Sequence, residues 1–521
     1  MKGRFSEPAP SVSPPAVPAL PYVHDLDAPL LQLGPRDVWT ARDAFEGCQI
    51  FGAIGSGKTS GSGATLAKAY LRAGWGGLVL CAKPDERKLW EGYCAETGRS
   101  RSLITFDASG DRRFNFLSYE MGRWPDGQAI THNVVMLLMN VLDAVRGRDA
   151  ASGGGDDFWR DSMTELLGNA IEPLWSAYQR VELSELMDFV QDHPRSVAEL
   201  QANPPPDTFW MRTMNAAMNR PAESAIHDED MRAIMGFWTK VFTNPDPRTS
   251  GNILATVSSK LAPLRRGRLR ELFCTETTIL PELAHEGAVI LLDLPVRVWS
   301  EAGILAQHIF KYIFQRAAET RPITDTTRPL FLWVDESQTF ISPYDAEFQS
   351  TARSSRVATV YLTQNLPNYY NKVGGRNPHD TVDALLGNFQ TKIFHANGDP
   401  RTNQWAADLI GKSVQWRMNV GTNINDSFSE GDSFGTSTNQ SPEGKTSHGS
   451  NSGRNRSRSE SQGRSWGASQ VVDYQVQPGQ FSTLKKGGPA NAGRVEGVFF
   501  QGGRMWNHTR STWMPCEFQQ G

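Results

Sequence analysis

The octapeptide GAIGSGKT at residues 52–59 constrains the fold more than any other stretch, because it matches G-x-x-x-x-G-K-[ST] at every fixed position. Gly52, Gly55 and Gly57 let the backbone curl tightly, so that consecutive N–H groups point at one phosphate. The preceding CQIFGAI is typical of a short buried strand, and the following TSGSGATLAKAYLRAG is typical of a helix. Strand, glycine-rich loop and helix in this order predict a phosphate-binding loop.

The chemistry of this loop predicts ATP and Mg²⁺ as cofactors. Lys58 is expected to reach the β- and γ-phosphates, and the Thr59 hydroxyl to ligate Mg²⁺. The following helix directs the positive end of its dipole at the same phosphates. The residues predicted to bind the nucleotide are Gly52, Gly55, Ser56, Gly57, Lys58, Thr59 and Ser60.

A second motif, LFLWVDESQTF at residues 330–340, runs from five bulky apolar residues into two adjacent carboxylates, Asp335 and Glu336. Charges at strand ends are common, so the pair alone indicates only a strand that ends in water. A phosphate loop in the same chain reverses this interpretation, because Mg²⁺ and the attacking water both need carboxylates. We therefore predict a buried strand whose end lies beside the loop, although it follows Thr59 by 276 residues.

Composition narrows the class of protein. The 521 residues suffice for two or three domains, and the net charge of −3 means that a nucleic acid would have to meet a local basic surface. Five cysteines without a C-x-x-C pair argue against a disulfide framework or zinc site and fit a reducing compartment. No apolar run approaches about 18 residues, so we expect a cytoplasmic protein without direct membrane insertion. The Pro-rich residues 1–28 are expected to form a disordered arm.

Strand and helix patterns divide the rest of the chain. Strands alternating with helices over 29–119 and 276–425 predict an α/β fold with a mostly parallel, doubly wound sheet, a P-loop NTPase core that includes the phosphate loop. Residues 120–275 show helical spacing with almost no strand signal and predict an inserted all-α domain. Two unrelated domains are the alternative, but neither flanking half carries enough strands for a sheet. Residues 468–521 are expected to complete the motor domain with strands.

Residues 426–467 are of low complexity, with 12 Ser and 7 Gly among 42 positions. Because so little apolar surface cannot offset the entropy of ordering, we expect a flexible loop. Its basic second half is compatible with a tail that touches DNA or with a solvated linker.

The segment STARSSRVATVYLTQN places Arg353 and Arg356 before a β-branched strand that ends in Gln364. In P-loop motors an amide at such a strand end can sense the γ-phosphate, and an arginine can stabilise transferred negative charge. The structural alternatives are a strand cap for Gln364 and a surface helix residue for Arg353.

Eight motifs in this order resemble the type IV secretion coupling proteins, the TraG/TraD-like conjugative DNA-transfer ATPases of the FtsK–HerA group: GAIGSGKTSG, LVLCAKPDER, RRFNFLSYE, GAVILLDLP, LFLWVDESQTF, STARSSRVATVYLTQNLPN, LLGNFQTKIF and DLIGKSVQW. The resemblance spans about residues 30 to 510. It implies a RecA-like motor domain, an inserted all-α domain and homo-hexameric rings that move DNA through a central channel. Relaxase or secretion-channel proteins would be further partners.

The resemblance also implies roles for single residues. Asp335 would hold the Mg²⁺ shell and Glu336 would polarise the attacking water, with Lys58 on the phosphates. Gln364 would be the sensor, and Arg353 the finger donated to a neighbouring subunit, with Arg356 as its rival. A cluster of Arg265, Arg266, Arg268 and Arg270 would suit phosphate contacts of DNA or a solvated helix end.

The chain departs from the family at its N-terminus, where coupling proteins usually carry transmembrane helices. Three functions therefore stay open: a coupling-type DNA translocase without its own anchor, recruited to the inner membrane by a partner; a HerA-like DNA-processing or defence translocase that works with a nuclease; and a nucleotide-binding scaffold that recruits protein substrates.

Overall fold

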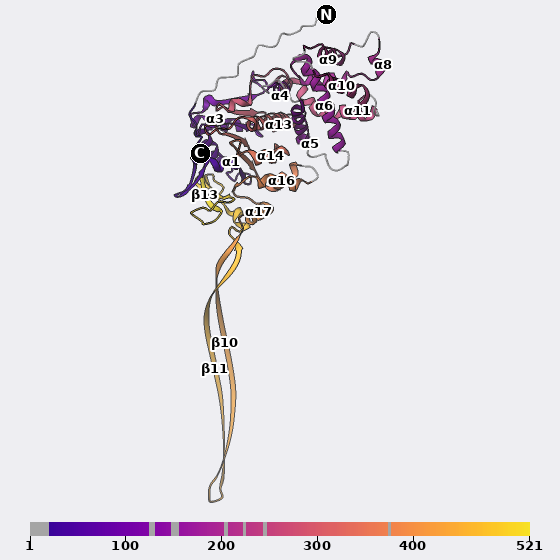
Figure 1. Ribbon diagram of the computed structural model, residues 1–521. Coiled ribbons are helices and arrows are strands. Elements are labelled where there is room, and N and C mark those ends of the chain that lie inside the picture. The colour runs from indigo at the N-terminus through magenta and orange to yellow at the C-terminus, as the bar shows by residue number, and fades with distance from the viewer. Residues whose placement is uncertain are drawn as a thin grey trace. The chain divides into compact units, whose positions relative to one another are not determined.

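The chain folds around a nine-stranded sheet whose central strands are parallel (Figure 1). This structure, a computed structural model, describes residues 20–123, 131–146, 156–202, 207–221, 226–242, 247–373 and 377–520. Across the sheet the strands lie in the order β13 (Trp513–Gln519), β12 (Arg494–Gln501), β9 (Thr391–Phe394), β3 (Cys48–Phe51), β8 (Val357–Thr363), β7 (Leu330–Val334), β4 (Gly76–Leu80), β6 (Val289–Asp293) and β5 (Leu103–Asp107).

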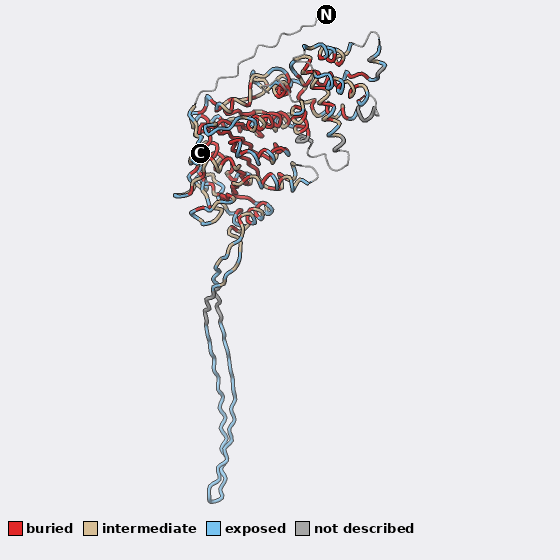
Figure 2. The backbone as a smooth tube through the Cα atoms, in the orientation of Figure 1, coloured by how far each residue is buried: buried red, intermediate tan, exposed pale blue. Residues whose placement is uncertain are grey.

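The strands from β9 to β5 all run parallel, and only β12 and β13 are antiparallel to their neighbours. Every residue of β7 and β8 is buried, as apolar strands in the middle of a parallel sheet require (Figure 2). The predicted α/β class with a mostly parallel sheet is therefore confirmed.

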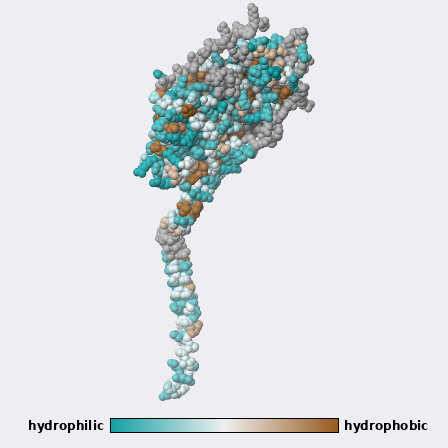
Figure 3. Space-filling model, in the orientation of Figure 1, coloured by the Kyte–Doolittle hydropathy of each residue, from teal (hydrophilic) through white to brown (hydrophobic). Residues whose placement is uncertain are grey.

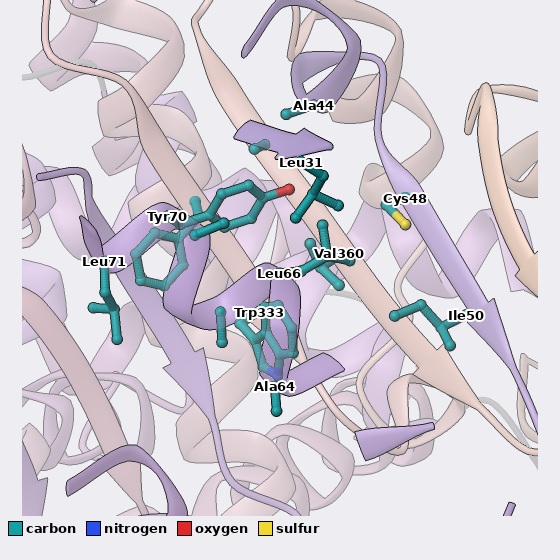
Figure 4. Packing of buried hydrophobic residues seen from close by; sticks show 14 of the residues in the cluster. Leu31, Ala44, Cys48, Ile50, Ala64, Leu66, Tyr70, Leu71, Trp333 and Val360 are labelled. Atoms are coloured by element: carbon teal, nitrogen blue, oxygen red, sulfur yellow. The ribbon is translucent and has the colours of Figure 1, made fainter. Parts of the chain in front are cut away.

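The core on one face of the sheet lies under two helices, α2 (Ala64–Arg72) and α3 (Glu86–Glu96). Leu66 and Tyr70 of α2 pack with Trp333 of β7 and Val360 of β8 (Figure 4). Full burial of each such large side chain stabilises the fold by about 1.5–3 kcal/mol. The helix α13 (Val296–Thr320) covers the other face, where Phe310 lies 6.1 Å from Phe106 between ring centroids.

Residues before and after the helical insertion build one sheet, which excludes two unrelated domains. Strand β4 pairs with both β6 and β7, although more than 200 residues separate it from either. Between β5 and β6 the described residues contain helices and no strand: α4 (Phe116–Gly122), α5 (Thr131–Arg146), α6 (Asp156–Tyr178), α7 (Leu183–Gln191), α8 (Val197–Leu200), α9 (Phe209–Met218), α10 (Asp228–Gly236), η3 (Phe237–Val241), α11 (Pro247–Leu261), η4 (Ala262–Arg265), α12 (Gly267–Phe273) and η5 (Pro281–Ala284).

The N-terminal segment differs from the expected arm where it is described. Residues 1–19 lie outside the described part, but residues 20–28 contact the core. Val23 accepts a hydrogen bond from Trp75 Nε1 at 2.9 Å, and Arg328 stacks over the Tyr22 ring at 4.3 Å. Aromatic and aliphatic residues among the prolines supply these contacts. The chain then forms β1 (Pro29–Gly34), β2 (Asp37–Thr40) and α1 (Ala41–Phe45).

A second unit, Ala407–Gln477, is separate from the first. It contains one antiparallel hairpin of β10 (Lys412–Gln440) and β11 (Thr446–Tyr474), which pair over 29 successive residues. Residues 426–467, expected to form a flexible loop, thus lie in paired strands and their turn. Low apolar content misled the prediction, because a strand ladder is held by backbone hydrogen bonds and cross-strand pairs rather than by a core.

Candidate nucleotide-binding site

The phosphate loop joins β3 to a turn of π-helix, η1 (Thr59–Gly63), which continues into α2. Gly55 and Gly57 have φ angles of 71° and 87°, in the left-handed region that glycine adopts without strain. A Cβ atom on Gly57 would also lie 2.5 Å from Cγ2 of Val495 in β12. The loop therefore requires glycine at both positions.

A pocket of about 190 Å³ lies over this loop, lined by Ala53, Gly55, Ser56, Gly57, Lys58, Thr59 and Ser60 together with Leu89 and Tyr93 of α3. The Ser56 hydroxyl is buried and has no hydrogen-bond partner. Lys58 is only 7% exposed, and among the described residues its ammonium makes no hydrogen bond or ion pair. Unpartnered buried donors are costly, so both groups fit an anionic ligand such as a nucleotide phosphate.

The structure brings the acidic pair to this loop. Strands β3, β8 and β7 are neighbours and parallel, so their carboxyl ends lie at the same edge of the sheet. Thr59 Oγ1 donates a hydrogen bond of 3.0 Å to Asp335 Oδ2 across 276 residues of sequence. Both are hard oxygen ligands of the kind that Mg²⁺ uses beside phosphate oxygens.

Glu336, next to Asp335, is buried and adopts a left-handed conformation with φ 49°. Its carboxylate accepts hydrogen bonds from Lys83 Nζ at 2.7 Å and from Gln338 Nε2 at 2.8 Å. Burial raises the pKa of Glu336, but hydrogen bonds from Lys83 and Gln338 and the charges of Lys83 and Lys58 outweigh it, lowering the pKa to about 2. Glu336 is therefore ionised at neutral pH.

Gln364 follows β8 and reaches the same carboxylate, with Nε2 at 3.4 Å from both oxygens of Glu336. Gln338 Oε1 accepts a hydrogen bond of 2.7 Å from Thr363 Oγ1. The two amides thus link the ends of β7 and β8 through one glutamate. A sensor at Gln364 would transmit any shift of Glu336 into β8.

Two residues of the site were not predicted. Lys83 and Glu86 follow β4, and Lys83 also lies 3.8 Å from Asp335. Burial, and then the charge of Asp335, raise the pKa of Glu86 well above its ordinary value. The signal was present in the sequence, because LVLCAKPDER is a buried strand followed at once by charged residues, as in the β7 motif.

Arg353 and Arg356 lie away from the loop in their own chain, since both precede β8 and the loop lies beyond its other end. Arg353 is exposed and forms an ion pair of 3.1 Å with Glu46 at an open cleft. Arg356 is buried, and its Nη1 donates to the carbonyls of Asp325 and Thr327 at 3.0 and 3.2 Å. Arg353 is thus the one of this pair whose guanidinium is accessible.

Two residues that the sequence did not assign to the site contact the loop and the turn after it: Gln520 in the C-terminal segment and His395 after β9. Gln520 Nε2 donates to Ser60 Oγ at 2.7 Å, and His395 Nε2 lies 2.6 Å from Ser62 Oγ. Burial lowers the pKa of His395 to about 4, so this imidazole is neutral at physiological pH. Predicted loop residue Ser60 is therefore engaged with the C-terminus.

The arginine cluster considered for DNA contacts is partly engaged within the chain. Arg268 donates to the carbonyls of Ala108 and Gly110 and pairs with Glu271. Arg265 lies 3.4 Å from Asp188. Contacts within the chain thus engage two of the four arginines of this cluster, Arg265 and Arg268.

The residues present fit ATP and Mg²⁺. Within the described ranges no three His, Cys, Asp or Glu residues converge on one point, so no all-protein metal cage is found there. A Mg²⁺ ion held by Thr59, Asp335 and nucleotide phosphates needs no such cage, because this ion keeps several waters.

The site and the sheet around it define a P-loop nucleotide-binding fold with a helical insertion. Residues 329–465 match the family model TraG-D_C, described as the TraM recognition site of TraD and TraG. The resemblance to the TraD/TraG coupling proteins that the motifs predict is thereby confirmed.

Solved structures show the same fold. The bacterial conjugative coupling protein TrwBdeltaN70, in its trigonal form with sulphate, matches with a TM-score of 0.56 and 12% identity over 94% of this chain and 89% of that chain. Its unbound monoclinic form gives a TM-score of 0.54, 12% identity and coverages of 93% and 87%. The plasmid coupling protein TrwB in complex with ADP and Mg²⁺ matches with a TM-score of 0.53 and 11% identity over 93% of this chain and 87% of that chain. Identities this low support the fold alone.

No curated protein sequence matches the chain. Among the described residues, none of the helices has the length and apolar character needed to cross a bilayer.

The contact between Lys83 and Glu336 should contribute to the thermal stability of the fold in a pH-dependent way. In Lys83→Met the pKa of Glu336 should rise towards its ordinary value of 4.5, because its main hydrogen bond is lost. A carboxylate with a lowered folded pKa stabilises the fold above pH 4.5, and this contribution is lost as pH falls towards 2. Thermal unfolding should show wild type more stable than Lys83→Met by roughly 2 °C at pH 7, with a gap that narrows in acid.

Lys88→Met is the matched control, since Lys88 is an exposed lysine of α3. A stability gap for Lys83→Met that stays constant from pH 7 to pH 3 would contradict the assigned contact.

Proposed function

We propose that the chain is a Mg²⁺-dependent ATPase that moves DNA, of the type IV coupling-protein type. The observation that carries the proposal is the meeting of the phosphate loop with Asp335 and Glu336 at one edge of the sheet, marked by the 3.0 Å hydrogen bond from Thr59. The fold of a conjugative coupling protein supports DNA as the substrate that the motor moves.

In the proposed mechanism, Lys58 and the loop amides would bind the phosphates, and Thr59 and Asp335 would hold Mg²⁺. The ion would neutralise charge that develops on the phosphoryl oxygens. Glu336 accepts a hydrogen bond from the attacking water and orients it. Its lowered pKa, about 2, keeps Glu336 ionised, so that the carboxylate can accept this hydrogen bond.

DNA should stimulate this hydrolysis. Net charge does not favour DNA, so binding must rest on local contacts to phosphate and should weaken steeply with salt. We expect single- or double-stranded DNA to raise the ATPase rate at low salt and to lose this effect at high salt. If DNA leaves the hydrolysis rate unchanged at every salt concentration, the chain would instead be a nucleotide-binding scaffold. The description of residues 329–465 as a TraM recognition site supports this alternative. A nuclease as the functional partner would favour the HerA-like alternative.

The active site is proposed to be shared between subunits of a hexameric ring, with Arg353 acting on the neighbour's nucleotide. Three observations support this: Arg353 is distant from its own phosphate loop, its side chain is exposed, and within the described ranges it pairs only with Glu46. A ring needs head-to-tail interfaces, so each site would combine a loop from one copy with an arginine from the next.

Lys58→Ala and Arg353→Ala should each be nearly inactive alone. After mixing and reassembly, roughly a quarter of the interfaces would combine an intact Lys58 with an intact Arg353, so some ATPase activity should return. Arg42→Ala, a change in the same cleft, is the control and should stay active. Full activity of Arg353→Ala would sink the shared site. If ATPase activity does not return on mixing, either Arg353 acts within its own subunit or all sites of the ring must hydrolyse ATP together. Mixtures of each mutant with wild type distinguish these two outcomes, because only in the second does one inactive subunit stop the whole ring.

A further inference from the structure

The hairpin of β10 and β11 is long, and its two strands are fully in register. In the described part of the chain these strands pair only with each other, without a register shift across 29 pairs. Strands of globular proteins are usually about 3–10 residues long, and an isolated two-stranded ribbon is at best marginally stable in water. Almost every described side chain of this ribbon is exposed on both faces (Figure 2). The ribbon therefore needs a partner to stay extended.

The two edges of the ribbon are open for such a partner. In an antiparallel pair, about half of the N–H and C=O groups of each strand point away from the other strand. Natural proteins protect such edges with proline, bulges, lysine or short strands. Neither strand contains proline or a bulge, and Lys412 is the single lysine of the two. These edges have the features of strands that accept another strand.

The edges carry opposite charge, which selects the partner. The middle of β10 carries carboxylates, and the neighbouring part of β11 carries arginines. They form three ion pairs with N···O distances of 2.8–2.9 Å: Arg454 with Asp432, Arg456 with Glu430 and Arg458 with Asp426. A neighbouring β11 against β10 would repeat these pairs. Two β10 edges, or two β11 edges, would place like charges side by side, which destabilises a sheet.

We propose that this hairpin is an assembly surface for a second copy of the chain, in which β11 of one copy pairs edge to edge with β10 of the next. The contact is head-to-tail and leaves the same two edges free at its ends, so it can be repeated from copy to copy. DNA phosphates would meet the carboxylates that lie beside these arginines, which argues against DNA as the occupant. On the side seen in the space-filling view, most coloured residues of the ribbon are hydrophilic or neutral, with a few hydrophobic ones among them (Figure 3).

The ribbon has two chemically distinct faces, which makes the pairing testable residue by residue. Since side chains alternate along a strand, odd-numbered residues share one face and even-numbered residues the other. From 425 to 439 and from 447 to 461, every odd position is Ser, Gly or Asn. The described large apolar residues of the even face are Val414, Trp416, Met418, Ile424, Phe428, Phe434 and Val472.

The test is disulfide cross-linking between two full-length chains. One carries Ser429→Cys, and the other carries a single cysteine at each position from 453 to 461. Four native cysteines are buried and Cys516 is partly exposed, so Cys516→Ser serves as the background. We expect disulfide-linked dimers at one or two neighbouring odd positions and a roughly tenfold lower dimer yield at even positions. The register of strand pairing decides which residues lie on the same face as Ser429. Ser429→Cys alone should give none. Equal yields at all positions, or none at any, would overturn the proposal.

Charge reversal separates contacts between chains from those within a chain. An all-basic hairpin (Asp426, Glu430 and Asp432→Arg) and an all-acidic one (Arg454, Arg456 and Arg458→Glu) should each lose the cross-link. An equal mixture should regain it between unlike chains, although each hairpin keeps its internal repulsion. No recovery in the mixture, or cross-linking only after a different protein is added, would contradict pairing between copies.

Lys58→Ala introduced into the cross-linking chains separates this proposal from the proposed ATPase. The cross-link should be unchanged, since edge pairing needs no nucleotide. A cross-link abolished by Lys58→Ala would overturn the inference that the hairpin alone supplies the contact.

Discussion

The hydrogen bond from Thr59 to Asp335 depends on a single constraint: β3, β8 and β7 are adjacent and parallel. Parallel neighbours bring the ends of the three strands to one edge, so a loop, an acidic pair and a glutamine from distant sequence meet. Antiparallel insertion of any one strand would move its functional residue to the opposite edge. The helical insertion leaves this arrangement intact, because it enters between β5 and β6 at the far side of the sheet.

Sequence patterns predicted those features that depend on short motifs. The spacing of the phosphate loop and the run LFLWVDE depend on local chemistry, and the structure brings both together. Lys83 was missed because its role is defined by a contact with Glu336, over 250 residues away. The rivalry of Arg353 and Arg356 was likewise open, since burial of Arg356 against backbone carbonyls is a tertiary fact.

The hairpin shows a different limit of composition-based reasoning. A high content of Ser and Gly led to the expectation of a flexible loop, yet acidic residues in its first half mirror basic residues in its second. That mirror pattern is a register signal, since it places Arg454 opposite Asp432 and Arg456 opposite Glu430, with Arg458 diagonal to Asp426. The same charges leave an acidic edge and a basic edge, so the pattern that closes the hairpin also suits it to join a neighbour.

Hydrolysis in the proposed mechanism depends on Glu336, which would orient the attacking water. The most direct measurement compares ATP binding and steady-state hydrolysis in Glu336→Gln, with Glu347→Gln, an exposed carboxylate of α14 (Tyr344–Thr351), as control. In Glu336→Gln we expect near-wild-type ATP affinity and a turnover lowered by a factor of about 10² or more, and in the control no change of either. Turnover of Glu336→Gln at the wild-type rate would contradict this role of Glu336.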